Sequence, residues 1–134
     1  TGIARTTILA YLQYLHEAKL IRLLYSDDLS VKKMQKPDKI LMENTNLLQA
    51  LSLQVPNIGT MRETFFCNQL GYTHQVEYNK RGDYLIDHKY VFEIGGKAKD
   101  GKQVANMENA YIASDECDYP IGNKLPLWLF GLMY

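Results

Sequence analysis

The sequence predicts an α+β fold in two parts, and three observations lead to that prediction. Apolar residues recur at helical spacing over residues 5–18, and a strand, a charged loop and a second strand follow. Residues 46–70 hold two further helical segments. Short alternating segments separated by turn residues then run from residue 74 to residue 114. We expect residues 1–44 to form one module and residues 45–134 to form a small mixed sheet flanked by helices.

The first module has the element order of the second half of a winged helix. A helix over residues 5–18 would place Ile8, Leu12 and Leu15 inward. It is followed by two strands and the polar loop between them, at residues 21–25, 39–43 and 26–38. Helix, strand, loop and strand in this order is typical of the winged-helix motif after its turn, so we expect a partial winged helix here.

The outer face of the first helix is a candidate DNA surface, because the helix after the turn of a DNA-binding winged helix enters the major groove. Thr6 and Gln13 would contact bases, and Arg5 would contact a phosphate. The loop offers cations for a basic wing: Lys32, Lys33 and Lys36. Glu17 lies on the same face and would repel the DNA backbone. Use of the module for protein contacts is therefore an equally open alternative.

The second module combines helices, strands and one loop rich in glycine and lysine. Helices are predicted at residues 46–54, 60–70, 103–109 and 126–133, strands at 74–79, 83–87, 90–94 and 110–114, and the loop at 95–102. Gly71 is the expected stop of the second helix. The four residues from Thr60 to Glu63 match a capping box, in which Glu63 would satisfy a backbone amide at the helix start.

The composition is that of a globular protein. The 134 residues are 46% hydrophobic and 22% charged, with a formal net charge of zero, which excludes a strongly basic nucleic-acid-binding chain. The most apolar stretch, residues 125–134, is too short to cross a bilayer. We expect a cytoplasmic protein with no membrane partner. Cys67 and Cys117 lack metal-ligand spacing, so we expect buried thiols in place of a zinc site.

Three carboxylates occupy positions from which they could converge on one divalent cation. Glu63 lies on a helix, Asp83 opens a strand, and Glu93 lies near the end of the next strand. Asp83 and Glu93 would bind Mg²⁺ or Mn²⁺, which activates water for phosphodiester hydrolysis. Each residue also has a structural explanation: a helix cap, a turn aspartate and a solvated charge at a strand end. For each residue alone we favour the structural explanation.

A lysine two residues after the second acid would complete such a site, and this chain has Gly95 there. Lys97 and Lys99 are close enough along the loop for one of them to reach back. Residues 96–103 also match GxxxxGK, but Gln103 stands where a serine or threonine would hold magnesium. We therefore expect a lysine-rich turn and not a phosphate-binding loop.

The first residues, Thr1-Gly2-Ile3, have the character of a turn that leads into a helix, and no initiator methionine precedes them. We expect the chain to be the C-terminal part of a longer protein. Its first module would then expose apolar surface that the longer protein covers, which favours self-association of the isolated chain.

Five segments in order resemble the C-terminal domain of unknown function of prokaryotic AAA-type ATPases. They are TGIARTTILAYLQYLHEAKLI, KPDKILMENTNLLQAL, NIGTMRETFFCNQL, GDYLIDHKYVFEIGGK and GNKLPLWLFGLMY. The resemblance implies a winged helix followed by a restriction-endonuclease-like fold related to PD-(D/E)xK nucleases. It places Glu63, Asp83 and Glu93 at the family's acidic positions. Gly95 departs from the usual lysine, with Lys97 as the displaced candidate, which argues against catalysis.

The resemblance also implies an ATPase core upstream that binds ATP, and no cofactor in this part of the protein. We expect a non-catalytic regulatory or recognition module that couples this ATPase to a partner, with DNA as the leading candidate. A divalent-metal-dependent nuclease is the first alternative, with Lys97 or Lys99 as its cation. A domain for protein interaction or homo-oligomerisation is the second alternative.

Overall fold

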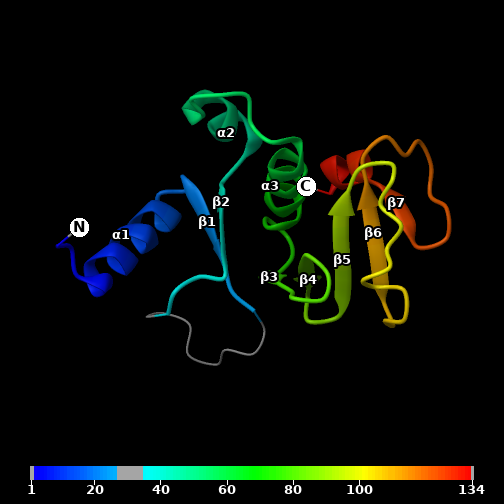
Figure 1. Cartoon of the computed structure of the whole chain (residues 1–134), viewed down its shortest axis with the longest axis horizontal. Helices are drawn as coiled ribbons and strands as arrows, with labels where there is room; N and C mark the ends of the chain where they lie inside the picture. Colours follow the sequence, from blue (N-terminus) through cyan, green and yellow to red (C-terminus); the bar gives the residue numbers. More distant parts are fainter. Residues whose placement is uncertain (1, 27–34, 134) are drawn as a thin grey trace.

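The computed structural model describes residues 2–26 and 35–133 and contains two sheets with a helix between them. The helices are α1 (Arg5–Glu17), α2 (Thr45–Leu51), α3 (Ile58–Leu70) and the 3₁₀ helix η1 (Leu127–Leu132). The strands are β1 (Ile21–Leu24), β2 (Lys39–Met42), β3 (Val76–Tyr78), β4 (Tyr84–Ile86), β5 (Tyr90–Gly95), β6 (Ala110–Ser114) and β7 (Lys124–Pro126). Figure 1 shows α1 at one end of the molecule, the larger sheet at the other and α3 between the two sheets. The predicted α+β class, with a small mixed sheet and flanking helices, is confirmed.

The elements predicted for residues 1–44 are present, each within one residue of its expected bounds. α1 ends where Lys19 adopts a left-handed φ of 58°. β1 and β2 pair antiparallel, with Ile21 opposite Met42 and Leu24 opposite Lys39. Their assignment to a winged helix stays a prediction, and the proposed wing residues Lys32 and Lys33 lie outside the described part of the chain.

The burial of α1 differs from the prediction. The helix has no buried residue, and the side chains of Ile8 and Leu15 are 42% and 40% exposed. The expectation that Ile8, Leu12 and Leu15 face a core is therefore wrong for Ile8 and Leu15, while Leu12 is half-buried. Helical spacing defines an apolar stripe, but only an element packed on that stripe can bury it.

The larger sheet is mixed. β3, β4 and β5 form an antiparallel meander, and β6 and β7 continue the sheet in parallel. Asp87 (φ 51°) and His88 (φ 55°) form the tight turn between β4 and β5, where two consecutive left-handed residues suit the twist of a hairpin. The turn was predicted one residue later, at His88 and Lys89.

The two faces of this sheet are covered by different segments. One face packs on α3 and η1. On this face the centre of the Phe66 ring lies 5.1 Å from the centre of the Phe92 ring and 4.9 Å from that of the Phe130 ring. The opposite face, which carries Val91, is covered by the segment 96–109, whose Val104 is buried. Because alternate strand residues face opposite sides, Glu93 lies on the same face as Val91.

Three local predictions in this module need correction. α3 begins at Ile58, because Asn57 caps it by accepting the N–H groups of Gly59 (2.8 Å) and Thr60 (3.4 Å). The capping box at residues 60–63 is therefore not the helix start. The predicted helix over 103–109 is a series of turns.

The C-terminal prediction was also incomplete. Residues 124–126 form β7, which pairs with β6, and the predicted last helix is the 3₁₀ helix η1. A three-residue strand is too short to show the alternation by which strands are found in a sequence. Pro126 is acceptable there because β7 is an edge strand.

Candidate functional site

Asp83 and Glu93 are brought together by the pairing of β4 with β5. Asn79 accepts hydrogen bonds from the N–H groups of Arg81 (2.9 Å) and Gly82 (3.0 Å), and this turn delivers Asp83 to the start of β4. The N–H of Asp83 donates to the carbonyl of Phe92, and its carboxylate accepts the N–H of Ile94 at 2.6 Å. Asp83 is thus held to both neighbours of Glu93, to Phe92 by its backbone N–H and to Ile94 by its carboxylate.

The positive charge of this cluster comes from the ammonium group of Lys99. Its Nζ lies 2.9 Å from Oε1 of Glu93, whose side chain is only 3% exposed. A Cβ built on Gly95 would lie 2.8 Å from both Cγ and Cδ of Lys99. The stem of Lys99 therefore occupies the space that a side chain two residues after Glu93 would fill, and only glycine at position 95 leaves that space open.

All three predicted acids affect the pKa of Lys99. Burial disfavours the charged form of Lys99, but the hydrogen bond and charge of Glu93, with the charges of Asp83 and Glu63, outweigh it and raise the pKa of Lys99. Lys99 is consequently a firmly protonated cation in the field of all three carboxylates that the sequence singled out.

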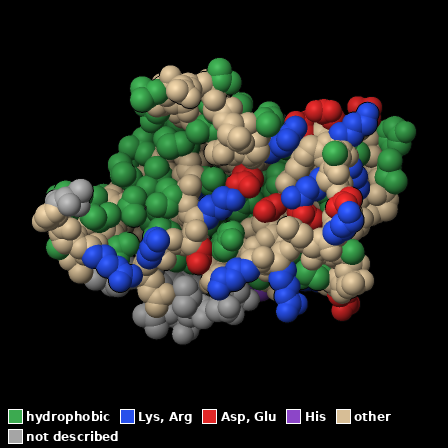
Figure 2. Space-filling view, in the orientation of Figure 1, with side chains coloured by type: hydrophobic (Ala, Val, Ile, Leu, Met, Phe, Trp, Pro, Cys, Tyr) green, Lys and Arg blue, Asp and Glu red, His purple; other side chains and the backbone are tan. Residues whose placement is uncertain are grey.

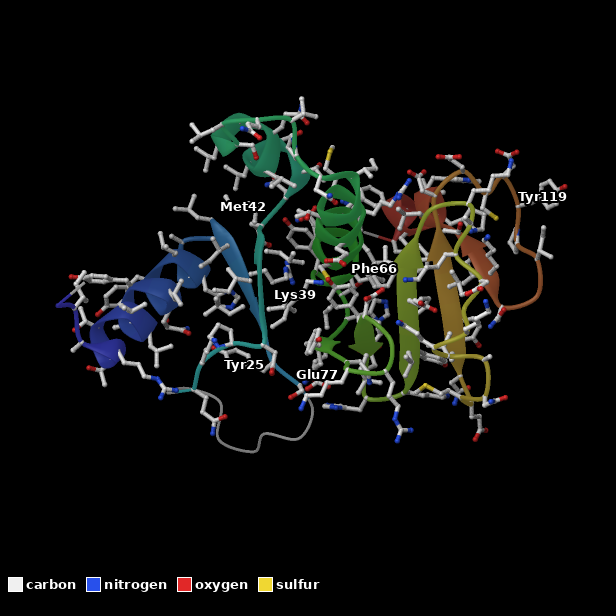
Figure 3. All side chains as sticks on the ribbon, viewed as in Figure 1. Tyr25, Lys39, Met42, Phe66, Glu77 and Tyr119 are labelled. Atoms are coloured by element: carbon white, nitrogen blue, oxygen red, sulfur yellow. The ribbon has the colours of Figure 1, made fainter. Side chains whose placement is uncertain are left out.

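Glu63 belongs to a second, adjacent cluster. Its carboxylate pairs with the ammonium of Lys39 from β2 and accepts the hydroxyl hydrogen of Tyr84 at 3.1 Å. The ammonium of Lys39 also lies 5.4 Å from the centre of the Tyr84 ring. Burial, and then the neighbouring Cys67 and Glu63, hold the pKa of Tyr84 well above its usual range, so its hydroxyl stays a donor. Figure 3 shows Lys39 between β2 and α3, with Phe66 on α3.

The charge balance of the two clusters favours the binding of a cation over the binding of an anion. Three carboxylates, on Glu63, Asp83 and Glu93, face two ammonium groups, on Lys39 and Lys99. One net negative charge remains. Figure 2 shows acidic and basic side chains next to one another near the middle of one face of the molecule.

One atom of the cluster is unsatisfied. Oε2 of Glu93 is buried and has no hydrogen-bond partner within the described residues, and a buried polar atom of this kind calls for a water or an ion. No group of three or more His, Cys, Asp or Glu side chains in residues 2–26 and 35–133 is arranged to hold a metal ion. A divalent cation would thus have two carboxylate ligands, Asp83 and Glu93. That number suits Mg²⁺, which keeps several waters or takes substrate oxygens.

The other predicted site residues lie elsewhere. The side chain of Lys97 is exposed, and its carbonyl accepts a hydrogen bond from Nζ of Lys124 at 2.7 Å. Of the two lysines that the sequence left open, Lys99 is the one that contacts Glu93. In the loop that imitates a phosphate-binding motif, Lys102 pairs with Asp100 at 2.8 Å. This contact agrees with a lysine-rich turn.

The candidate DNA-contacting residues are not brought to the acidic cluster. Arg5 and Thr6 are exposed on α1, and Gln13 donates a hydrogen bond to Glu17 at 3.1 Å. Lys36 is exposed ahead of β2. Figure 1 places α1 at the opposite end of the molecule from β5 and β6, so the two predicted sites are separate surfaces.

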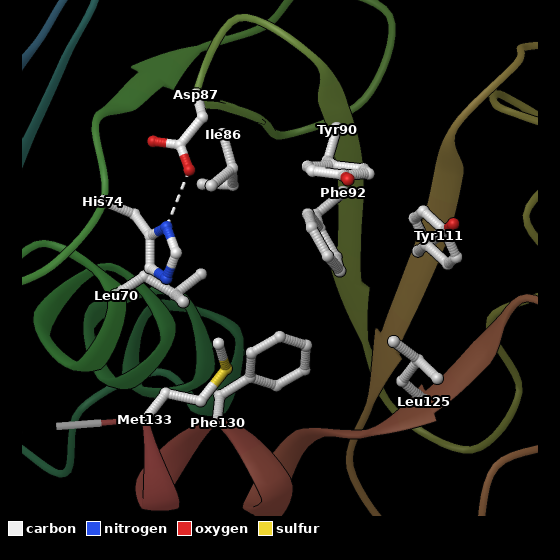
Figure 4. A pocket seen from close by; sticks show the side chains of 10 residues that line it. All are labelled: Leu70, His74, Ile86, Asp87, Tyr90, Phe92, Tyr111, Leu125, Phe130 and Met133. Atoms are coloured by element: carbon white, nitrogen blue, oxygen red, sulfur yellow. Dashed lines mark hydrogen bonds and ion pairs between the residues drawn. The ribbon is translucent and has the colours of Figure 1, made fainter.

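The sequence also gave no indication of an apolar pocket of about 290 Å³ beside the sheet. It is lined by Leu70, His74, Ile86, Asp87, Tyr90, Phe92, Tyr111, Leu125, Phe130 and Met133 (Figure 4). At its rim, Nδ1 of His74 lies 2.7 Å from Oδ2 of Asp87. The hydrogen bond from His74, followed by that from the N–H of Gln75, lowers the pKa of Asp87. Both residues were treated only as strand ends, and the pair itself fixes the β4–β5 turn.

Lys39 and Tyr84 were also missed as site residues. Each lies in a predicted strand, and their contact with Glu63 joins β2, α3 and β4. A charged residue at the start of an otherwise apolar strand was the only available signal for Lys39.

Comparison with protein-family models, curated proteins and solved structures finds no significant match to this chain. No helix in the described ranges is long and apolar enough to span a membrane. The assignment of the site therefore depends on its geometry and charge.

Proposed function

We propose that Asp83, Glu93 and Lys99 form a divalent-cation-dependent site of the nuclease type that acts on a nucleic-acid phosphodiester. The observation that carries this proposal is the position of Lys99, which reaches Glu93 through the space left open by Gly95. Two acids and a lysine are thereby gathered although the lysine is absent from its usual place in the sequence. The order α3, β3, β4, β5, with β6 parallel to β5, agrees with the nuclease-like fold implied by the resemblance.

The acidic residues and the lysine of the cluster would have different roles. Asp83 and Glu93 would hold Mg²⁺ or Mn²⁺, which when bound supplies a Lewis acid and lowers the pKa of a water molecule. Lys99 is protonated and would donate a hydrogen bond to a phosphate oxygen, stabilising the charge that develops there. Glu63 contributes its negative charge and connects the site, through Tyr84 and Lys39, to β2.

The charge balance explains why the cation is needed. A cluster with one net negative charge repels a phosphodiester, so direct binding of nucleic acid through Lys99 alone is unfavourable. A divalent cation reverses the sign of the site. Nucleic acid and metal should therefore bind together.

A non-catalytic recognition module is the second candidate, and one observation favours it. Each carboxylate already has a contact inside the protein: Glu63 with Lys39, Asp83 with the N–H of Ile94, and Glu93 with Lys99. Carboxylates whose contacts are all inside the protein agree with a purely structural role. The chain would then act through other surfaces, as a module attached to an AAA-type ATPase that binds DNA or protein.

Calorimetric titration of Mn²⁺ tests the proposal. The unaltered chain should bind about one equivalent, and both Asp83→Asn and Glu93→Gln should lower its affinity by about tenfold or more, because each removes one ligand charge. Glu108→Gln is the matched control, since Glu108 is exposed and outside the cluster.

The metal-loaded chain should then nick supercoiled DNA, and the two site variants should not. Mn²⁺ binding without cleavage of single- or double-stranded substrates supports the recognition module. Absence of Mn²⁺ binding would reject the cation site altogether.

A further inference from the structure

A groove of about 390 Å³ lies between α1 and β2, away from the acidic cluster. Its apolar lining comes from Ile3, Ile8, Leu9, Leu12, Pro37 and Ile40. Ile3, Ile8 and Ile40 are 54%, 42% and 46% exposed. Single exposed apolar side chains are ordinary, but a contiguous hollow surface of them marks a binding site. Figure 2 shows a continuous hydrophobic area over α1 and the neighbouring strands β1 and β2.

α1 buries little apolar surface within the described part of the chain. It has 13 residues and none of them is buried, although it carries Ile8, Leu9, Leu12 and Leu15. Isolated helices of this length are marginal in water, and most helix stability in proteins comes from packing of an apolar face. An occupant of the groove would supply that packing.

The charges at the groove indicate which kind of ligand it would bind. Arg5 and Lys36 line it, and no carboxylate does so within the described residues. Two carboxylates near the groove in the described part of the chain make hydrogen bonds inside the protein. Glu17 accepts a hydrogen bond from Gln13, and Asp38 accepts the N–H of Ser26 at 2.8 Å. A ligand with acidic groups beside an apolar stripe therefore meets complementary charge.

We propose that the α1–β2 groove binds an amphipathic helix of a protein partner, with acidic residues bordering its apolar stripe. A helix that packs along α1 can place side chains at i, i+3, i+4 and i+7 into an elongated apolar groove. The apolar lining of the groove does not suit DNA, because the phosphate backbone of DNA requires cations and hydrogen-bond donors along its length. This inference does not depend on the acidic cluster.

Two designed peptides of about 15 residues, roughly four helical turns, test the proposal. They share one leucine stripe, bordered by glutamates in the first and by lysines in the second, and each carries a fluorophore for anisotropy. We expect the glutamate peptide to bind about tenfold more tightly at low salt, with the preference shrinking as salt rises.

Paired variants locate the binding. Arg5→Glu with Lys36→Glu should reverse the preference between the peptides, whereas Arg81→Glu with Lys89→Glu, two exposed cations elsewhere, should leave it unchanged. Ile40→Thr should weaken binding of both peptides, while Tyr119→Ser, another exposed apolar position, should not. Circular dichroism of each variant checks that the fold is retained.

Three results would overturn the proposal: equal affinity for the two peptides, unchanged binding by the Arg5→Glu/Lys36→Glu chain, or no binding at all. A dimer that Ile40→Thr dissociates, as measured by sedimentation velocity, would also overturn it, because the occupant would then be a second copy of the chain.

Discussion

α1 and α3 have the same length and opposite environments. Each contains 13 residues, but α1 buries none of them, whereas α3 buries Thr64, Phe66, Cys67, Asn68 and Leu70. Both helices carry apolar side chains, so composition does not separate them. α3 lies between the two sheets and contacts η1, while α1 contacts β1 of the small β1–β2 sheet. The same local pattern therefore becomes a core helix or an exposed helix according to what lies beside it.

The charged groups follow the same division. On α3 and the larger sheet, Glu63 and Glu93 form ion pairs with Lys39 and Lys99 inside the protein. Around α1, Arg5 and Lys36 border an open apolar groove. We therefore expect substitutions near α3 to change stability and metal binding, and substitutions on α1 to change association with partners.

The largest expected difference is between Phe66→Ala and Ile8→Ala. Phe66 has no exposed surface and contacts three aromatic rings, so its truncation should cost about 3–5 kcal/mol of unfolding free energy. Ile8→Ala, at a 42% exposed position, should cost less than about 1 kcal/mol. Urea unfolding followed by circular dichroism measures both. Equal losses would show that α1 is buried in solution, and the contrast between the helices would be wrong.

An exchange at positions 95 and 99 tests how closely the charged groups of the larger sheet are packed. Gly95→Lys alone would force its side chain against the stem of Lys99, at a cost of about 1–3 kcal/mol. Lys99→Gly alone would leave the buried carboxylate of Glu93 without its ammonium. Because the two positions share one space, the double variant should recover about 1 kcal/mol or more relative to the sum of the single changes.

The control for this cycle is Gly95→Lys combined with Lys97→Gly, which should show no such recovery, since Lys97 is exposed. Additive free energies at positions 95 and 99 would mean that the lysine at 99 does not replace a side chain at 95. Chemical denaturation of the four chains decides between these outcomes.

The smallest expected effect is a dependence of stability on alkaline pH. The folded-state pKa of Lys99 is raised, so its contribution is complete below the unfolded value of about 10.4 and is lost as pH rises through the folded value. The melting temperature of the unaltered chain relative to Lys99→Met should thus fall as pH rises above about 10.4. Lys97→Met should show no such change, and tyrosine ionisation cancels in the comparison. A pH-independent difference would contradict the pairing of Lys99 with Glu93.

Local patterns predicted most of the secondary structure. The bounds of α1, β1, β2 and β5 came within one residue because periodicity and turn residues are properties of neighbouring positions. The failures occurred where a tertiary contact decided the conformation. Residues 103–109 form turns because Val104 packs onto the far face of the sheet, and residues 124–126 form a strand because β6 offers an edge.

The acidic site was predictable in its members and not in its arrangement. Asp83 directly precedes β4 and Glu93 lies in the adjacent β5, and antiparallel pairing brings such residues together. A helix cap was the structural explanation favoured for Glu63 alone, but Asn57 caps the helix, and Glu63 contacts Lys39 and Tyr84. Nothing along the chain distinguishes Lys99 from Lys97 as the lysine that returns to Glu93.

The sequence by itself determined the α+β class, the order of the elements from α1 to β5 and the three carboxylates, because spacing and residue type act over a few neighbouring positions. Only the tertiary structure decided which lysine meets Glu93, which helix is buried and where an apolar groove stays open. Those outcomes depend on the path of the loop over Gly95 and on what packs beside α1 and α3. Such contacts join residues far apart in the chain, and their free energy exists only once the whole fold has formed.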